Sequence, residues 1–429
     1  MKRIIKKLIP SFLLNWYHFS LAFLGALVFG FPSKKLKVIG VTGTNGKSTV
    51  IEMISRILEE AGLKTAALSS INFKIADKEE PNMLKMTMPG RFILQKFLKQ
   101  AVDEKCQYAV IEVTSEGIKQ YRHRFIDFET AVFTNLSPEH IEAHGSFRKY
   151  RQAKEELFKI VKGVHILNID DKNVEYFLRY PANEKYGYGS ATDSSQLAAS
   201  KNTNYQMLAT NCKTSITGTS FELNGLIFKL KLFGLFNVYN ALAAVCIATH
   251  YGIDLKVCKR ALEKMEIIPG RMELVISKPF KVIVDYAFTP NALEKIYKTF
   301  RNNLKPRKLI CVLGACGGGR DKWKRPILGK LAVQYCDSVI ITNEDPYDEN
   351  PMEIINQVAK GVGGKAQKIL DRRKAIKESL KQARKQDLVI ITGKGCEPWI
   401  CMEKGRKIPW DDRKVVKEEF KKINYGFKK

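Results

Sequence analysis

A lysine and a serine at the end of a glycine-rich stretch are the residues of this chain whose types and spacing most clearly suggest chemistry. The stretch reads GTNGKST and runs from Gly43 to Thr49. Small residues allow backbone N–H groups to converge on phosphate oxygens, while Lys47 adds a positive charge and Ser48 adds a hydroxyl group for Mg²⁺. Val41 stands where the pattern G-x-x-x-x-G-K-[ST] has its first glycine, so a glycine-rich turn with a surface lysine is the alternative.

The elements on either side of this stretch decide between the two interpretations. Residues 36–41 form a short apolar run that is typical of a buried strand. From Ser48 onward, apolar residues recur about one helical turn apart as far as Leu58, and Gly62 suits a helix end. Strand, glycine loop and helix are the context that a phosphate-binding loop requires, so we favour nucleotide binding.

Polar side chains near later predicted strands are candidates to assist such a loop. Glu112 lies in the strand YAVIEVT, where its carboxylate either points at the phosphates and binds Mg²⁺ or faces solvent. His140 and His144 follow the strand TAVFTNL, where each is either a ligand or a structural histidine. Lys154 lies in the predicted helix FRKYRQAKEELFKIV, and its type and position alone assign it no role.

A second series of strands and helices follows Pro269 and Gly270, which indicate a junction. Its glycine loop, GACGGGRDKWKR, carries Arg320 and three further basic residues that suit a carboxylate or a phosphate. The later loop TNEDPYDENP carries acidic residues, among them Glu344 and Asp345, that either attract an amino group or form a solvated turn.

The order of these elements predicts the fold class. Strands that alternate with helices imply an α/β protein with mostly parallel sheets and sites at the carboxyl ends of strands. We expect a basic and hydrophobic segment at residues 1–35, a central P-loop ATPase domain at 36–267, and a C-terminal Rossmann-like α/β domain at 268–429.

Charge and cysteine content limit the partners and the compartment. The net charge is +28, but the basic residues are mostly lysines spread along the chain, so we expect no nucleic-acid partner. A basic P-loop NTPase that binds nucleic acid is the alternative of a different class, and DNA-stimulated ATP hydrolysis would support it. The nine cysteines are scattered and form no C-x-x-C pair, which indicates a reducing, cytoplasmic compartment.

The segment from Leu8 to Phe31 is apolar and long enough to span a bilayer. Basic residues flank it on both sides, so the positive-inside rule assigns no orientation. We expect a helix or helical hairpin that lies on the inner face of the membrane; packing on the protein itself and a true span are the alternatives.

Many short motifs, taken in order, resemble the Mur ligase family. They are GVTGTNGKST, IEVTSEGIKQYR, FTNLSPEHIEAHG, YRQAKEELF, GLFNVYNALAA, PGRME, VDYAFTPNALE, GGGRDKWKRP, NEDPYDENP, GKGCE and DDR. The resemblance covers about residues 30 to 425 and is strongest to the UDP-N-acetylmuramoyl-tripeptide synthetase branch.

This resemblance implies an ATP- and Mg²⁺-dependent ligase of peptidoglycan biosynthesis. Such an enzyme would activate a carboxylate of UDP-MurNAc-L-Ala-D-Glu, or of an equivalent muramoyl peptide, as an acyl phosphate. It would then join the carbonyl to a diamino acid such as lysine or diaminopimelate. It would act as a monomer on small-molecule substrates. A relative of folylpolyglutamate or cyanophycin synthetases, or a ligase that acts on a lipid-linked precursor, is the alternative.

The resemblance also assigns roles to individual residues. Lys47, Glu112, His140 and Lys154 would be catalytic; Mg²⁺ would bind Ser48, Glu112, His140 and a carbamylated Lys154. ATP would contact Gly43, Thr44, Asn45, Gly46, Lys47, Ser48, Thr49, Asn240, Arg271 and Asp285. The muramoyl peptide would contact Thr87, Thr114, Gln120 and Arg122, and the amino acid would contact Arg320, Glu344, Asp345, Tyr347, Gly393 and Glu397.

The chain departs from the family's pattern at several of these positions. Tyr347 replaces the arginine that reads the distal carboxylate of diaminopimelate, and a tyrosine hydroxyl cannot form a charge-assisted bidentate pair. This difference weakens the expectation of diaminopimelate and leaves lysine or another diamine open. Cys396, Phe288, Thr114 and Glu116 also differ from the family's usual residues.

The family's uridine-binding N-terminal domain has no counterpart before the phosphate-binding loop. We therefore formulate the hypothesis that the substrate is a lipid-linked muramoyl peptide, held at the membrane with the help of residues 8–31.

Overall fold

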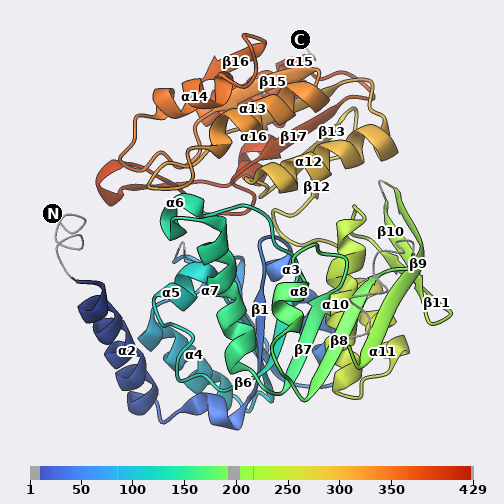
Figure 1. Ribbon diagram of the computed structural model, residues 1–429. Coiled ribbons are helices and arrows are strands. Elements are labelled where there is room, and N and C mark those ends of the chain that lie inside the picture. Colours follow the sequence, from blue (N-terminus) through green and yellow to red (C-terminus); the bar gives the residue numbers. More distant parts are fainter. Residues whose placement is uncertain (1–9, 85, 192–202, 216, 427–429) are drawn as a thin grey trace.

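Two α/β units stacked on one another form the body of the protein (Figure 1). The computed structural model describes residues 10–84, 86–191, 203–215 and 217–426. The expected α/β class, with a nucleotide-binding unit followed by a C-terminal unit, is confirmed. The exact domain limits remain a prediction.

The first unit is built on an eleven-stranded sheet in the order β11-β10-β9-β8-β7-β6-β1-β5-β2-β3-β4. The seven strands from β9 to β2 run parallel, and hairpins extend the sheet at both edges. The strands are β1 (Lys37–Thr42), β2 (Thr65–Leu68), β3 (Asn72–Ile75), β4 (Lys78–Pro81), β5 (Tyr108–Glu112), β6 (Phe128–Phe133), β7 (Val164–Asn168), β8 (Glu184–Ser190), β9 (Tyr205–Ser215), β10 (Gly218–Leu223) and β11 (Leu226–Leu230).

Helices cover both faces of this sheet, which explains why its central strands are apolar throughout. In β1, Ile39 and Val41 belong to the core cluster beneath α3 and α10, while Val38 belongs to the cluster on the other face, beneath α4 and α7. The helices are α3 (Lys47–Glu60), α4 (Arg91–Asp103), α5 (Ser115–Lys119), α6 (Ile141–His144), α7 (Phe147–Ile160), α8 (Glu175–Leu178), α10 (Phe236–His250) and α11 (Leu255–Lys264).

The second unit has a six-stranded sheet in the order β12-β13-β17-β14-β15-β16, parallel except for β12. One core cluster joins this sheet to α12, α13 and α14, and another joins its other face to α15 and α16. The strands are β12 (Glu273–Ile276), β13 (Lys281–Asp285), β14 (Leu309–Leu313), β15 (Ser338–Thr342), β16 (Ala366–Ile369) and β17 (Leu388–Thr392). The helices are α12 (Pro290–Thr299), α13 (Lys324–Tyr335), α14 (Pro351–Ala359), α15 (Arg372–Gln382) and α16 (Asp412–Gly426), with short turns η3 (Phe300–Leu304) and η4 (Glu403–Gly405). A small hairpin joins β18 (Trp399–Cys401) to β19 (Lys407–Pro409).

The N-terminal apolar segment forms one helix, α2 (Ser11–Val28), followed by the short turn η1 (Pro32–Lys35). This helix packs against α4 at the edge of the molecule, so the single-helix form of the expectation holds and the hairpin does not. Leu8 and Ile9 lie outside the described residues. Within the described residues, no helix is both long enough and apolar enough to cross a bilayer.

Candidate functional site

A cleft of about 650 Å³ lies where the carboxyl ends of the first sheet's strands meet the second unit. Most residues singled out from the sequence line this cleft. They are Gly43, Thr44, Asn45, Gly46, Lys47, Ser48, Thr49, Thr87, Glu112, Thr114, His140, Lys154, Asn240, Arg271, Asp285 and Arg320. Folding therefore brings together residues that are up to 277 positions apart in the chain (43 to 320).

The glycines of the phosphate-binding loop are required by close contacts. Gly43 has a φ of +146°, and a Cβ atom there would lie 2.0 Å from Thr134 Oγ1. Gly46 has a φ of +85°, and a Cβ atom there would lie 2.5 Å from Asn240 Oδ1. Any larger residue at either position would be strained and would displace its neighbour. Gly46 immediately precedes α3, so the loop delivers its backbone N–H groups to the helix N-terminus.

Beyond the loop, Glu112 at the end of β5 lies at the centre of a polar group. Its Oε2 atom accepts hydrogen bonds from Ser48 Oγ at 2.8 Å and from the Ser70 backbone N–H at 3.0 Å. Its Oε1 atom lies 3.6 Å from Lys47 Nζ. A carboxylate and a hydroxyl at this spacing are hard oxygen donors of the kind that suits Mg²⁺. Ser70 was missed from the sequence, because a serine in a loop after a short strand carries no distinctive signal.

Lys154 is buried beside the phosphate-binding loop. Its Nζ atom donates a hydrogen bond to the Gly43 carbonyl at 2.6 Å and lies over the Tyr150 ring. Burial, with the nearby Lys47 charge adding to it, lowers the pKa of Lys154 well below its ordinary value. A lysine with so depressed a pKa has a neutral, nucleophilic amine at a much lower pH than a surface lysine.

His140 also faces the cleft and is held in its neutral form. Burial, reinforced by the charge of Arg320, lowers the pKa of His140 to about 2. Arg320 Nη1 lies 3.5 Å from His140 Nδ1. The neutral imidazole is the form that binds metal ions. His144, by contrast, lies against Tyr150 and Glu116, which fits a structural role.

The second unit closes the cleft with two arginines and a network of anchoring contacts. Arg271 stacks on Tyr286 and reaches Ser70 Oγ at 3.4 Å, across 201 residues of sequence. Asp285 accepts hydrogen bonds from the backbone of Met272 and Ala287, and burial raises the pKa of its carboxyl group, with Arg271 opposing the shift.

The two units are further joined by contacts that the sequence did not reveal. Lys324 donates to Glu139 at 2.6 Å, and both side chains are buried. Asp321 accepts from the backbone N–H groups of Ile141 and Glu142 at the start of α6. These contacts hold His140 close to the glycine loop that carries Arg320.

Two of the residues expected to contact the muramoyl peptide lie just outside the cleft. Arg122 Nη2 donates to Gln120 Oε1 at 2.8 Å, and Arg122 also contacts the Met88 carbonyl. Arg91 of α4 donates to the Gln120 carbonyl. Thr87 and Thr114 line the cleft beside this cluster.

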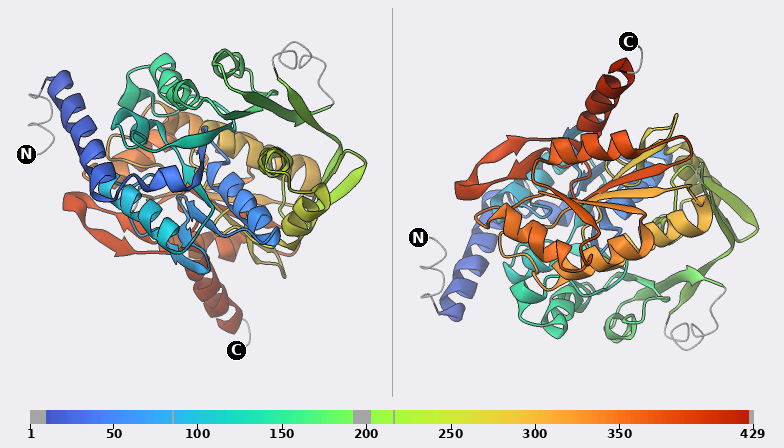
Figure 2. Two further views of the ribbon diagram at one scale, coloured as in Figure 1. Left: turned by 90° about the horizontal axis from the view of Figure 1, so that it is seen from below. Right: turned by 90° about the horizontal axis from the view of Figure 1, so that it is seen from above.

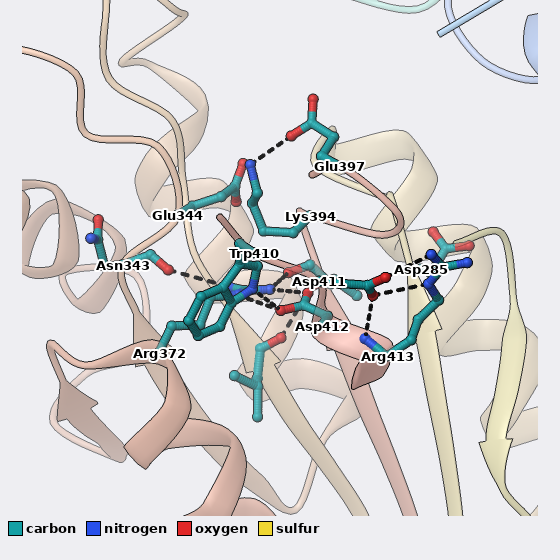
Figure 3. A network of polar contacts seen from close by, with 12 residues as sticks. Asp285, Asn343, Glu344, Arg372, Lys394, Glu397, Trp410, Asp411, Asp412 and Arg413 are labelled. Atoms are coloured by element: carbon teal, nitrogen blue, oxygen red, sulfur yellow. Dashed lines mark hydrogen bonds and ion pairs between the residues drawn. The ribbon is translucent and has the colours of Figure 1, made fainter. Parts of the chain in front are cut away.

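The residues expected to contact the amino acid gather around a lysine that sequence reasoning did not single out. The fully buried Lys394 donates to Asp345 Oδ1 at 2.9 Å and to Glu397 Oε2 at 2.7 Å. Figure 3 shows Lys394 reaching Glu397, with Glu344 beside it. Glu397 also accepts a hydrogen bond from the Tyr286 hydroxyl at 2.9 Å, and Tyr286 lines the cleft. The group therefore borders the cleft through Tyr286.

The remaining members of this set are held by close packing. Tyr347 has a φ of +51° and lies against Gly318 of the glycine loop, where a Cβ atom would come within 2.6 Å of its ring. Gly393 leaves no room for a side chain, because a Cβ atom there would lie 2.3 Å from Glu344 Oε2. Below them, Arg372 joins Asp412 to the carbonyl groups of Asn343 and Thr392, at the ends of β15 and β17 (Figure 3).

These features define an enzyme class: a P-loop nucleotide-binding α/β unit whose cleft is completed by a second α/β unit. The comparisons with known proteins agree with this class. The sequence profile of the Mur ligase middle domain matches residues 41–248, and that of the Mur ligase glutamate ligase domain matches residues 270–395. The chain belongs to the Mur ligase family.

Similar proteins support the expected enzyme class, an ATP-dependent acid–amino-acid ligase. The chain is 39% identical over 413 residues to the UDP-N-acetylmuramoyl-L-alanyl-D-glutamate–2,6-diaminopimelate ligase of Syntrophomonas wolfei, covering 93% of this chain and 81% of that protein. It is 38% identical to the ligase of the same name from Aquifex aeolicus, over 91% of this chain and 78% of that protein.

Solved structures show the same arrangement. A ligase structure of that name matches with a TM-score of 0.59 at 29% identity, covering 91% of this chain and 79% of the other. Mycobacterium tuberculosis folylpolyglutamate synthase matches with a TM-score of 0.67 at 17% identity, covering 90% and 92%, which shows a shared fold.

Proposed function

We propose that this chain joins a diamino acid to UDP-MurNAc-L-Ala-D-Glu, or to an equivalent muramoyl peptide, during peptidoglycan biosynthesis. The observation that carries the proposal is the composition of the cleft. Lys47, Glu112 and Lys154 of the first unit share it with Arg271 and Arg320 of the second. The activity named for relatives at 35–39% identity supports the choice of substrate class.

The reaction requires two displacements. A carboxylate oxygen of the acceptor attacks the γ-phosphorus of ATP, the bond to the bridging oxygen breaks, and ADP leaves. The amino group of the incoming amino acid then attacks the acyl carbon, the bond to the phosphate oxygen breaks, and the amine loses a proton. Catalysis of such steps rests on positioning and on neutralising phosphate charge.

Within this scheme, the phosphate-binding loop, Gly43 to Thr49, would hold the ATP phosphates, and Lys47 would offset the charge on the transferred group. Asn240, Arg271 and Asp285 would complete the nucleotide site. Ser48, Glu112 and His140 would hold Mg²⁺, which neutralises phosphate charge when it is bound.

Lys154 would act as a carbamate. Its neutral amine can add CO₂ with loss of a proton, which converts a cation that repels Mg²⁺ into an anion that attracts it. Three features support this role: burial, the depressed pKa, and the hydrogen bond to the Gly43 carbonyl of the phosphate-binding loop. In the described parts of the chain, no group of three His, Cys, Asp or Glu side chains is arranged to hold a metal, so a carbamate would supply a missing anionic ligand.

The substrates would bind at opposite ends of the cleft. Thr87, Thr114, Gln120 and Arg122 would contact the muramoyl peptide. Arg320, Glu344, Asp345, Tyr347, Gly393 and Glu397 would contact the amino acid, with Lys394 setting the local charge. Because one chain supplies both ends, we expect a monomer to be active.

Phosphate release from Mg·ATP tests this function. The purified chain is given UDP-MurNAc-L-Ala-D-Glu with lysine, ornithine or diaminopimelate, one at a time, and products are identified by mass spectrometry. We expect release that requires both the acceptor and one of the amino acids. Release that does not depend on the amino acid, or no release with any of them, would contradict the proposal for this acceptor.

A further inference from the structure

The helix α2 presents large apolar side chains to solvent, which is the reverse of an ordinary surface helix. Its buried residues are small or polar: His18, Ala22, Gly25 and Ala26 face the protein. The two helices come close at Gly25, where a Cβ atom would make an ordinary van der Waals contact, at 3.6 Å, with the Arg91 backbone of α4. The helix is therefore fixed to α4 by its narrow face, and its wide apolar face is left uncovered.

The uncovered face carries aromatic and aliphatic residues along its whole length. Trp16 is 70% exposed, Tyr17 58%, Leu27 53% and Val28 66%. Leu13, Phe19, Phe23 and Leu24 are also exposed. An exposed apolar patch of this size on a protein surface indicates a binding surface.

Large apolar side chains are also exposed on α4, which packs against α2, and in the segment before α4. The first turn of α4 exposes Phe92 and Ile93, and the segment before it exposes Met83, Leu84 and Met86. Thirteen of the 22 exposed large hydrophobic residues among the described positions belong to α2 and these two segments. Figures 1 and 2 place α2 at the outer edge of the molecule from three directions, and among the described residues no element lies over its outer face.

The positive charges near the apolar face indicate what kind of partner it binds. No charged residue occurs between Leu8 and Ser33, whereas Lys34, Lys35 and Lys37 follow directly and are exposed. Four basic residues precede the segment in the sequence: Lys2, Arg3, Lys6 and Lys7. An apolar helix face with tryptophan and tyrosine, followed directly in the sequence by exposed lysines, matches the boundary between lipid headgroups and acyl chains in an anionic bilayer.

We propose that α2 and the adjoining apolar residues dock the protein onto the surface of an anionic lipid bilayer. The helix would lie in the interface, because its inner face is already bound to α4 and it does not span. Lys34 and Lys35, which follow the helix and are exposed, would contact lipid phosphates. This proposal concerns lipid binding alone and does not depend on the substrate assigned above.

Docking in this way would also orient the cleft. The His18 ring contacts Arg91 at 2.6 Å, and Arg91 donates to the Gln120 carbonyl, next to Arg122. Phe19 and Phe23 pack edge-on against Phe125, with ring centres 5.1 and 5.4 Å apart. The helix is thus tied to the segment that we assign to the acceptor, so that end of the cleft would lie near the bilayer.

Vesicle flotation tests the docking surface with the full chain. Vesicles of phosphatidylcholine alone and of phosphatidylcholine with phosphatidylglycerol are compared at low and high salt. The variant W16Q/L24Q/L27Q removes three exposed apolar residues from α2. The matched control I227Q/I267Q/L370Q removes three that are 54%, 57% and 45% exposed elsewhere. Glutamine keeps a good helix propensity, and circular dichroism verifies folding of each variant.

We expect the native chain and the control to float with anionic vesicles, more strongly at low salt, and the α2 variant to bind at least about tenfold more weakly. Equal binding by the α2 variant, or no flotation of the native chain, would overturn the proposal. Light scattering after size-exclusion chromatography tests whether a second copy of the chain covers this face instead. If the native chain and the control are dimers and the α2 variant is a monomer, the face is a dimer interface and the lipid-docking proposal is overturned.

Discussion

The phosphate-binding loop and the buried group around Lys394 balance charge in different ways. At the phosphate-binding loop, two lysines, Lys47 and Lys154, accompany the single carboxylate of Glu112. In the Lys394 cluster, made of Asp345, Lys394 and Glu397, one buried lysine lies between two carboxylates. Because the pKa of Lys154 is depressed, Lys47 is the charged lysine of the loop, which offers phosphate this cation and its backbone N–H groups. The Lys394 cluster instead keeps one negative charge that suits an amino group. The loop is arranged for a ligand, whereas the cluster is largely satisfied by its own contacts.

The largest effect is expected at the phosphate-binding loop. The change K47A removes the cation nearest Glu112 and should lower ligase turnover at least about 10³-fold, because charge on the transferred phosphate is no longer offset. The melting temperature should fall modestly, since Lys47 makes one hydrogen bond, to the Thr44 carbonyl, and one ion pair, to Glu112 at 3.6 Å. Turnover and thermal unfolding are measured beside K64A, an exposed lysine. Near-native turnover in K47A would show that Lys47 does not offset the charge of the transferred phosphate.

The Lys394 cluster should respond through stability first. The change K394A leaves Asp345 and Glu397 without their shared cation in a buried site, which should cost about 3–5 kcal/mol of unfolding free energy. Urea unfolding measures this loss, with the exposed-lysine variant K365A as the control. A stability loss below about 1 kcal/mol would mean that the cluster is as free to receive a ligand as the loop is.

The preference of the enzyme for one amino-acid substrate over another should depend on position 347. The change Y347R places a guanidinium beside the glycine loop, where it can pair with a distal carboxylate. One charge-assisted pair should raise the preference for diaminopimelate over lysine, measured as a ratio of kcat/KM, by about 10- to 100-fold. The change Y347F should leave the ratio nearly unaltered. An unchanged ratio in Y347R would remove position 347 from the amino-acid site.

Part of the acid sensitivity should originate at His123, which does not line the cleft. Burial lowers the pKa of His123 to about 3, and neither ring nitrogen has a partner. Below its ordinary value of 6.5, the unfolded chain takes up a proton that the folded chain does not, so stability falls as pH drops from 6.5 toward 3. The slope approaches about 1.4 kcal/mol per pH unit for one such group.

The change H123L should therefore flatten the fall in melting temperature between pH 6.5 and 5 while leaving turnover at pH 7.5 unaffected. Native chain and variant are compared by thermal unfolding at a series of pH values. Parallel curves for the two proteins would show that His123 does not control acid stability.

Helices and strands were predicted correctly where a short stretch of sequence has a clear apolar pattern. A strand made of polar residues was missed. The apolar runs of β1, β5 and β6 and the helical patterns of α3 and α7 are evident in the sequence itself. Strand β9 was not predicted, because Tyr205 to Ser215 is polar and becomes a strand only by pairing with β8 and β10. The apolar N-terminal segment was expected, but its single-helix form was decided by packing on α4.

The sequence by itself determined the phosphate-binding loop and the polar residues at the strand ends, since a strand, a glycine loop and a helix are formed by neighbouring residues. Only the tertiary structure decided how distant groups pair. Arg271 reaches Ser70, Lys324 neutralises Glu139, and burial depresses the pKa of Lys154. These properties depend on how the two units dock and on how much water they exclude, and no short stretch of sequence specifies either.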